Sequence, residues 1–522
     1  METMLAMMMT LAGVAGEDTI DTYERASLDS TVSIESEIEG LSEQNESERD
    51  HLEVLDRLQW LQENTIDLNS AKEDDLLLIP GITPHEAQAI VKLRGRVGKF
   101  SSVGQLAVVD NIGPEVVSKL QPYVHVKSQT EQNSVHESPV LQIRTRVLRD
   151  LQPRAGFTDG SYSGSSIKSY SRVAMNIQEN VRSGVLVSKD AGEQFSTGFL
   201  SGFAEARLGE SRVLAGDFTM EAGQGLVFWS GAAYGKGSDA VNAVRKSGAG
   251  LRPYRSSSEF GFFRGVSATT ALDMSDMILH LTALVSRRKL SATLNEDGTF
   301  SAFYDAGLYR TESEITKRNT VRETILGGRA EVSGTGLWNA GINYYHSTFD
   351  RPLISSSPFA FSGRMNDVAG ADASIRVGRL DVFGEIARSG SGGRAGILGG
   401  MVSVSRSTRF AVIYRDYGAS FDHAHAGAFG ERSNTNNEIG LYLGVQSVIS
   451  RSVRLSGYVD HFKFRAPSST VPLPATGSDM LIESDVQVSS SLSLIGRYAQ
   501  KVVQSSESFI DEQGREARVV VD

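Results

Sequence analysis

Residues 66–126 have the sequence IDLNSAKEDDLLLIPGITPHEAQAIVKLRGRVGKFSSVGQLAVVDNIGPEVVSKLQPYVHV, which is dense in signals that start helices. A Ser or Thr followed three residues later by Glu or Gln can form a capping box, which pairs free amides at a helix start. Three such pairs occur: Ser70 with Glu73, Thr83 with Glu86, and Ser102 with Gln105. Pro84 and Pro114 fit first helical positions. The sequence predicts short helices over residues 71–79, 84–96, 102–109 and 114–121.

Two turns between these helices follow one pattern. Each places an apolar residue between small or polar residues just before a helix start, in LIPGIT (78–83) and VDNIG (109–113). Such a turn leaves backbone N–H groups pointing outward at a helix N-terminus, where they can hold a phosphate without a charged side chain. The predicted phosphate contacts are Gly81, Ile82, Thr83, Asn111, Ile112 and Gly113.

With these turns, residues 66–126 resemble the ComEA-like tandem helix-hairpin-helix domain, a family whose members include a DNA receptor for competence. The resemblance implies binding of duplex DNA, without sequence preference, through the two hairpins. Both hairpins depart from the family's Gly-Ile-Gly pattern, at Thr83 and at Asn111. Asn tolerates positive φ, whereas Thr serves better as a helix cap than in an open phosphate cradle.

Charge leaves two functions open for this module. Residues 66–127 hold seven basic and seven acidic side chains, and the whole chain has a formal net charge of −11, so bulk electrostatic attraction to nucleic acid is not expected. Four cations nevertheless cluster after the second helix: Lys92, Arg94, Arg96 and Lys99. They are candidate contacts to a DNA backbone; the alternative is a solvated helix end on a module that only docks other proteins.

The chain before the module divides into three parts. Residues 1–16 contain a short apolar run followed by small residues, which predicts an export signal although a basic start is missing. Residues 17–50 are acidic and polar, which predicts a disordered spacer. Residues 51–127 are expected to form the helix-hairpin-helix domain, beginning with a short amphipathic helix that carries Leu52, Leu55, Leu58 and Leu61.

The sequence changes character after a polar linker at residues 128–138. From Val140 onward, about 16 to 18 segments alternate apolar and polar positions and are separated by Gly, Ser, Asn and Asp clusters. This pattern predicts that residues 139–522 form an antiparallel β-barrel in the outer membrane, with a soluble β architecture as the alternative. The last residues, VVVD (519–522), lack the aromatic that commonly ends an outer-membrane strand, so we expect an incomplete barrel.

Two features suggest how the barrel interior is used. Segments including GDF (216–218), GQGL (223–226), WSG (229–231), GLRPY (250–254) and FFRG (262–265) are similar to the β part of large Gram-negative envelope proteins that carry such a module. Gly223, Gly225 and Gly231 indicate close backbone approach, as in a segment folded into a lumen. Downstream lie Arg245, Lys246, Arg252, Tyr254 and Arg255, which either contact an anionic polymer or pair with lumen carboxylates.

Signs of an enzyme are weak. His423 and His425 with Asp422 would suggest a metal site, but no further ligand cluster accompanies them, and the Gly-rich run at 389–400 fits a hairpin turn. Cysteine is absent. We therefore predict an α+β multidomain, non-enzymatic envelope protein without catalytic residues, cofactor or metal. Its expected partners are duplex DNA, outer-membrane lipid and other envelope proteins, with the N-terminal domain in the periplasm.

Overall fold

The structure is a computed structural model, and it describes most of the chain. The described residues are 58, 61–62, 65–71, 73–76, 79, 82, 84–108, 117, 120–126, 139–177, 180–229, 236–242, 244–246, 248–334, 337–355, 359–405, 407–432, 434–450, 452–467, 474–489, 492–504 and 511–521. The predicted export signal (1–16), spacer (17–50) and linker (128–138) lie outside them.

The N-terminal module is built from short elements. These are β1 (Ile66–Asp67), α4 (Glu73–Leu76), α5 (Pro84–Val97), the 3-10 helix η1 (Val103–Val108) and β2 (Val124–His125). The predicted helix at 84–96 is confirmed as α5, which ends before Gly98 with its φ of +84°. The predicted helix at 71–79 is found as the shorter α4, and the one at 102–109 is wound as the 3-10 helix η1. Most of the predicted helix at 114–121 lies outside the described residues.

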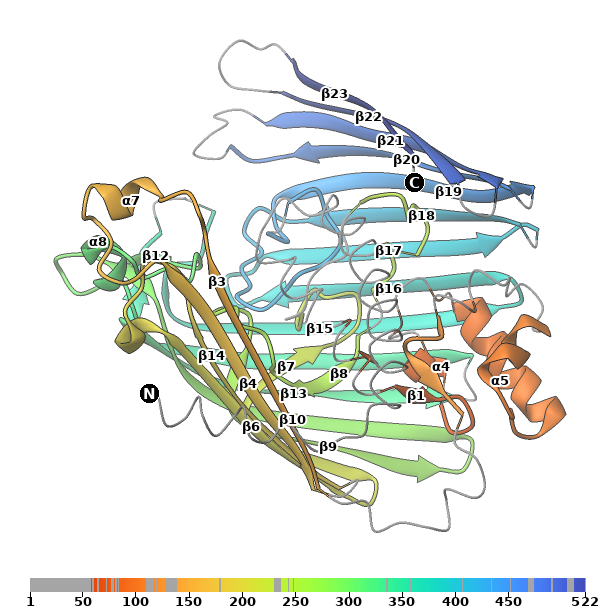
Figure 1. The fold of residues 1–522 in the computed structure, drawn as a ribbon, viewed down its shortest axis with the longest axis horizontal. Coiled ribbons are helices and arrows are strands. Elements are labelled where there is room, and N and C mark those ends of the chain that lie inside the picture. The colour runs from red at the N-terminus through yellow and green to blue at the C-terminus, as the bar shows by residue number, and fades with distance from the viewer. Residues whose placement is uncertain are drawn as a thin grey trace.

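The remainder is one large antiparallel sheet arranged as a barrel, which confirms the predicted fold class (Figure 1). Its elements are β3 (Val140–Arg149), α7 (Ala155–Thr158), β4 (Ile167–Ile177), β5 (Val181–Lys189), η3 (Phe195–Thr197), β6 (Phe199–Leu208), β7 (Ser211–Glu221), β8 (Gly250–Pro253), β9 (Phe263–Met274), β10 (Met277–Leu290), β11 (Ala292–Leu294), β12 (Phe300–Phe303), α8 (Glu312–Ile315), β13 (Val321–Gly334), β14 (Trp338–Leu353), β15 (Gly363–Val377), β16 (Leu380–Ser389), β17 (Arg394–Ser403), β18 (Thr408–Tyr417), β19 (Glu438–Ser450), β20 (Val453–Phe464), β21 (Ala475–Ser489), β22 (Leu492–Gln504) and β23 (Asp511–Val521).

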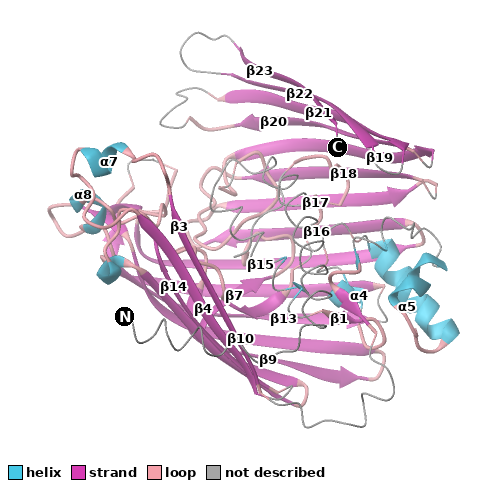
Figure 2. Ribbon diagram, in the orientation of Figure 1, coloured by secondary structure: helices cyan, strands magenta, loops and turns pink. Residues whose placement is uncertain are grey.

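Antiparallel pairing follows chain order almost throughout. In the described chain, eighteen long strands pair in succession from β3 to β23, while the short strands β8, β11 and β12 are additions beside them. The count agrees with the number of alternating segments in the sequence. Figure 2 shows that α7 and α8 are brief interruptions in the loops of a β structure.

The two ends of the barrel differ in the length of their connections. At the end where β3 begins, successive strands are joined by short turns, such as 209–210, 275–276 and 378–379. Ser275 and Gly378 take positive φ there, as tight hairpin turns require. At the opposite end the connections are long, and they include 222–249, 291–320 and 418–437. These two ends are called the short-turn end and the long-loop end below.

Side chains alternate along each strand between an apolar outer face and a more polar inner face. On β14, Ile342 (63% exposed) and Tyr344 (48%) point outward, whereas Asn343, Tyr345 and Ser347 are buried inside. On β16, Ile386 is 67% exposed while its neighbour Glu385 is buried. The described helices include none that is both long enough and apolar enough to cross a bilayer, a finding that says nothing about a β-barrel.

Candidate nucleic-acid interface and the filled lumen

The module has a hydrophobic core of its own. Its buried members are Leu58, Leu61, Leu68, Ala71, Leu76, Ile79, Ile82, Ala87, Ile90, Phe100, Leu106, Leu120, Tyr123 and Val124. Leu58 and Leu61 are fully buried and helical, which agrees with the amphipathic helix predicted before the module. The module therefore buries apolar surface without using the strands of the barrel.

A short parallel pairing joins the two ends of the module. Ile66 on β1 is the partner of Val124 on β2, and the amide of Ile66 donates to the Tyr123 carbonyl at 2.8 Å. The amide of Leu68 donates to the His125 carbonyl at 2.9 Å. This pairing holds the beginning and the end of the module together, because β1 and β2 lie near its two ends.

Arg94 faces inward and stabilises the module. Its Nη1 donates to the carbonyls of Leu68 (2.8 Å) and Ala71 (2.6 Å), which ties α5 to the segment preceding α4. Charged donors give stronger hydrogen bonds than neutral ones, so this contact holds α5 against residues 68–71. Of the four cations singled out in the sequence, Arg94 is thus engaged within the fold.

The other three predicted cations are exposed on one side of α5 and just beyond it. Lys92 and Arg96 are four residues apart on α5, the spacing that puts side chains on the same helix face, and Lys99 follows the end of the helix. None of them forms an ion pair within the described residues. We call Lys92, Arg96 and Lys99 the basic edge.

Of the predicted phosphate contacts in the hairpins, the structure describes Ile82. Its side chain is 7% exposed and packs in the module core, and its amide donates to the Ile79 carbonyl at 3.3 Å. Ile82 therefore contributes to the core, and its N–H is already used in the turn. The remaining predicted phosphate contacts, Gly81, Thr83, Asn111, Ile112 and Gly113, lie outside the described residues.

Two of the predicted capping boxes differ from the geometry found. The Ser70 hydroxyl donates to Asp67, with Oγ to Oδ2 at 3.0 Å. Gln105 accepts from the Ser101 amide at 2.8 Å, one residue earlier than predicted. Both differences arise because Asp67 and Ser101 offer closer local partners than the expected ones.

The barrel lumen is filled by two long loops from the long-loop end. Residues 222–229 follow β7 inward, and Leu226, Val227 and Phe228 are fully buried in a core shared with inward residues of the strands. The carboxylate of Glu385 on β16 accepts hydrogen bonds from the amides of Gln224 (2.7 Å) and Leu226 (3.0 Å). One buried side chain thus clamps the loop, and the prediction of a segment folded into a lumen is confirmed at residues 222–229.

Glycine is required at the bend of this loop. Gly223 has a φ of +56°, and a Cβ there would come within 2.8 Å of the Glu385 carboxylate. Gly225 has a φ of +86°, and its Cβ would lie 3.1 Å from the Gly427 carbonyl. Both positions need a left-handed backbone and close approach, which is why the sequence pattern indicated them. Gly231 lies outside the described residues.

The loop at 418–437 packs against the first one. The amide of Trp229 donates to the His425 carbonyl at 2.7 Å, and the amide of Gly427 donates to the Gly225 carbonyl at 2.9 Å. The His425 ring lies 3.2 Å from Glu323 (Nε2 to Oε1), and burial lowers the pKa of His423 to about 4. The two histidines are thus part of lumen packing, and the described residues contain no group of His, Cys, Asp and Glu arranged for a metal.

Buried ion pairs connect these loops to the strands. Arg415 on β18 is fully buried and donates to Asp460 on β20 at 2.9 Å and to Glu438 on β19. Lys236 in the first loop pairs with Asp460 and with Glu431 of the second loop. These residues were not singled out from the sequence: Arg415, Glu438 and Asp460 carry the signal of a buried charge on an apolar strand, whereas Lys236 and Glu431 lie in loops and carry none.

The basic and aromatic strip noted in the sequence is also paired internally. Arg245 lies 4.0 Å from Asp381, and Arg252 pairs with Glu221. The Lys246 ammonium lies 4.1 Å from the Trp229 ring centre, and Arg255 lies over Phe203. This agrees with the alternative that lumen cations pair with lumen carboxylates and aromatic rings.

These features define a two-part protein, in which a helix-hairpin-helix module precedes an antiparallel barrel with a filled lumen. The family model described as "Helix-hairpin-helix motif" matches residues 62–125. Proteins named "Endonuclease/exonuclease/phosphatase family domain-containing protein 1" match over 88 residues, at 32% identity in Mus musculus and 31% in Homo sapiens. The match covers 17% of this chain and 15% of either relative, so the chain spans a small part of their length.

Solved structures resemble the barrel more distantly. The outer membrane protein OprD from Pseudomonas aeruginosa has a TM-score of 0.36 and 12% identity, covering 73% of this chain and 92% of that one. Wzi from Escherichia coli, described as a carbohydrate-binding β-barrel, has a TM-score of 0.36 and 12% identity, covering 77% and 87%.

Proposed function

We propose that this chain is a non-enzymatic outer-membrane protein whose helix-hairpin-helix module lies in the periplasm and binds duplex DNA without sequence preference. The membrane part rests on the rows of exposed apolar side chains around the barrel. Val185, Val285, Leu326, Ile386 and Ile482 are each at least half exposed on strands whose inner faces carry polar groups. In water such a surface is unfavourable, whereas in lipid it is the expected outer face of a barrel.

Chain connectivity supports the periplasmic placement of the module. Outer-membrane barrels have short turns on the periplasmic side and long loops outside. β3 starts at the short-turn end, so the chain that precedes it, including the module, joins the barrel from that side. This connectivity supports a periplasmic module.

The DNA part rests on the basic edge within the matched helix-hairpin-helix motif. Lys92 and Arg96 share one side of α5, Lys99 lies just beyond its end, and all three are exposed without an ion-pair partner within the described residues. Each cation that contacts a phosphate releases a counterion and steepens the dependence of binding on salt. Hairpin amides would add contacts that depend less on side-chain charge.

The test is salt-dependent binding of labelled duplex DNA to the full chain in detergent micelles, followed by fluorescence anisotropy. Replacing all three basic-edge residues with Gln should lower the slope of log affinity against log salt by up to about 3, roughly one per lost contact. A matched variant replaces three exposed cations of the barrel, Arg364, Arg388 and Lys463, with Gln and should leave the slope unchanged. If wild-type protein binds no DNA at low salt, the DNA proposal fails.

A second candidate function is docking of another envelope protein. It is favoured by the neutral charge of the module and by the use of the Ile82 amide and Arg94 inside the fold. Docking predicts affinity for a protein partner that survives high salt, with no DNA binding at any salt concentration. Crosslinking from Cys introduced at position 92 in intact cells separates a protein partner from DNA.

A further inference from the structure

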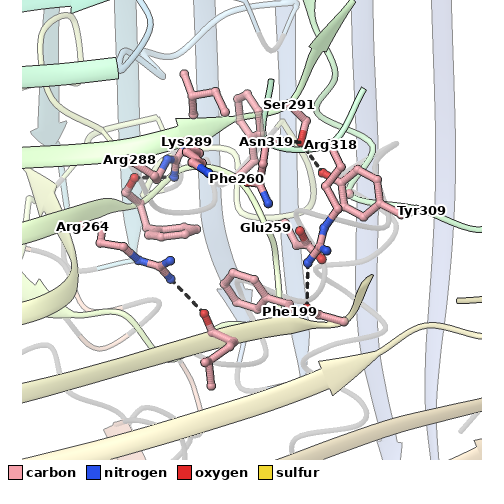
Figure 3. A pocket seen from close by; sticks show the side chains of 15 residues that line it. Phe199, Glu259, Phe260, Arg264, Arg288, Lys289, Ser291, Tyr309, Arg318 and Asn319 are labelled. Atoms are coloured by element: carbon pink, nitrogen blue, oxygen red, sulfur yellow. Dashed lines mark hydrogen bonds between the residues drawn. The ribbon is translucent and has the colours of Figure 1, made fainter. Parts of the chain in front are cut away.

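A cavity of about 150 Å³ lies among the loops of the long-loop end, away from both the module and the loop clamp at Glu385. It is formed where the start of β6, the segment before β9, the end of β10 and the 291–320 loop meet. Figure 3 shows Phe199, Glu259, Arg288, Tyr309 and Arg318 among the side chains that line it. A cavity of this size accepts a molecule with one six-membered ring.

Two guanidinium groups of the cavity make no direct ion pair with a carboxylate of the described residues. Arg288 donates from Nη1 to the Phe262 carbonyl, and Arg318 donates to the carbonyls of Ser196 and Gly198, both at 2.9 Å. Neither arginine forms an ion pair within the described part of the chain. This differs from Arg264 at the cavity edge, which makes hydrogen bonds of 2.6 and 2.7 Å to Asp217.

Main-chain carbonyls therefore fix both guanidinium groups in place, while the carboxylates that act on them, Glu323 on Arg288 and Glu259 and Glu193 on Arg318, lie beyond ion-pair distance. A buried cation that has no direct contact with a carboxylate is stabilised by a ligand that supplies one. Arg288 is 6% exposed, so its charge is directed into a confined site and away from bulk water. Such preorganised cations are suited to a carboxylate.

Aromatic rings supply the other half of the site. Phe199 and Phe262 lie with ring centres 5.6 Å apart, and the Arg288 guanidinium stacks 4.3 Å from the Phe262 ring centre. Tyr309 is held by its hydroxyl, which lies 2.6 Å from Ser291 Oγ. Phe260 completes the apolar lining. These rings offer flat surfaces to a ring of the ligand.

We propose that this cavity binds a small organic anion, a carboxylate carried on a single six-membered ring, which enters from the long-loop end of the barrel. The carboxylate lies between Arg288 and Arg318, and the ring packs on Phe199 and Phe260. The site is separate from the module, so it stands whether or not the module binds DNA.

Glu259 gives the site a pH dependence. Burial raises the pKa of Glu259 to about 8, and it makes no hydrogen bond or ion pair within the described residues. The charged groups facing it are Glu193 and Asp190 before β6, Arg318 of the 291–320 loop and Arg264 on β9. Below this pKa the carboxyl is neutral and tolerates an anion, whereas above it the ionised carboxyl repels the ligand.

The test is isothermal titration calorimetry on the full chain in detergent micelles. Benzoate and glucuronate are the probes, because they carry the same carboxylate on an aromatic and on a sugar ring, and benzamide and glucose are their uncharged counterparts. We expect at least one acid to bind and its neutral counterpart to bind about tenfold more weakly or not at all, since a charged hydrogen bond contributes about 1.5–3 kcal/mol.

Variants localise the site. Arg288→Gln and Arg318→Gln should each weaken binding by about tenfold or more. Arg287→Gln, the next residue on the same strand but exposed outside, is the matched control. Heat-modifiable migration on gels verifies that each variant keeps a folded barrel. The proposal is overturned if neither acid binds, if the neutral counterparts bind as tightly, or if the folded arginine variants bind like wild type.

The Glu259→Gln variant tests the pH dependence separately. Wild-type affinity should fall as pH rises through about 8, and the variant, which stays neutral, should keep its affinity at high pH. An equal fall in both proteins would show that Glu259 does not face the ligand and would contradict this arrangement of the site.

Discussion

Cations are used in opposite ways in the lumen and on the module. In the lumen, Arg415 and Lys236 are buried and each contacts two or more carboxylates. On the module, Lys92, Arg96 and Lys99 face solvent without an ion-pair partner in the described residues. The buried pairs hold loops inside the barrel, whereas the exposed cations remain available to an external partner. Burial together with pairing, and not charge alone, separates structural cations from candidate binding cations.

The largest expected effect comes from breaking a lumen pair. Arg415→Met would leave the buried Glu438 without its cation and Asp460 with Lys236 alone, which costs about 3–5 kcal/mol of folding free energy. Urea unfolding in detergent micelles measures the loss. Arg388→Met, at an exposed position of β16, is the control and should change stability little. Equal stability of the two variants would contradict the structural role of the buried pair.

The next effect separates the two cores. Ile90 is fully buried in the module core, so Ile90→Ala should destabilise the module by about 2–5 kcal/mol. The barrel should keep its heat-modifiable migration, because the two buried clusters share no residue. Far-ultraviolet circular dichroism follows the helices, and Val97→Ala, exposed on the same helix, is the matched control. Loss of both regions together would show that they fold as one unit.

A smaller effect concerns the loop inside the barrel. Gly223→Ala adds a Cβ that meets the Glu385 carboxylate in a left-handed backbone, which costs about 1–2 kcal/mol and loosens the clamp. Ion conductance across planar bilayers should rise. Gly209→Ala has a similar φ of +62° in a short turn with nothing nearby, so it should show the backbone cost without a change in conductance. Unchanged conductance in Gly223→Ala would argue against a clamp at this position.

The smallest effect distinguishes Arg94 from the basic edge. Arg94→Lys loses the planar group that bridges the Leu68 and Ala71 carbonyls and should lower module stability by about 1 kcal/mol. Arg96→Lys keeps an exposed charge and should change neither stability nor DNA affinity. Chemical denaturation measures the first quantity and anisotropy the second. A larger loss of DNA affinity in Arg94→Lys than in an Arg96→Gln variant would reverse the assignment.

Sequence reasoning was most successful where the signal was local. Pro84 and the apolar spacing that follows it located α5, and alternation after Val140 located the strands. Gly223 and Gly225 indicated the bend of the inner loop, because only glycine tolerates that backbone next to close neighbours. The exact caps were predicted less well: the Ser70 hydroxyl donates to Asp67, six residues before the expected Glu73, and Gln105 accepts from Ser101, one residue before the expected Ser102.

The sequence by itself determined the order of the parts: a helical module with hairpin turns, then a long series of alternating strands. These follow from periodicity and turn chemistry, which act between residues close in the chain. Which cations are paired depends on the tertiary structure, since Lys236 and Asp460, or Arg288 and the Phe262 carbonyl, meet although they are far apart in the chain. Electrostatic environment depends on neighbours in space, and that is the physical reason why Arg94 and Lys92 could not be told apart beforehand.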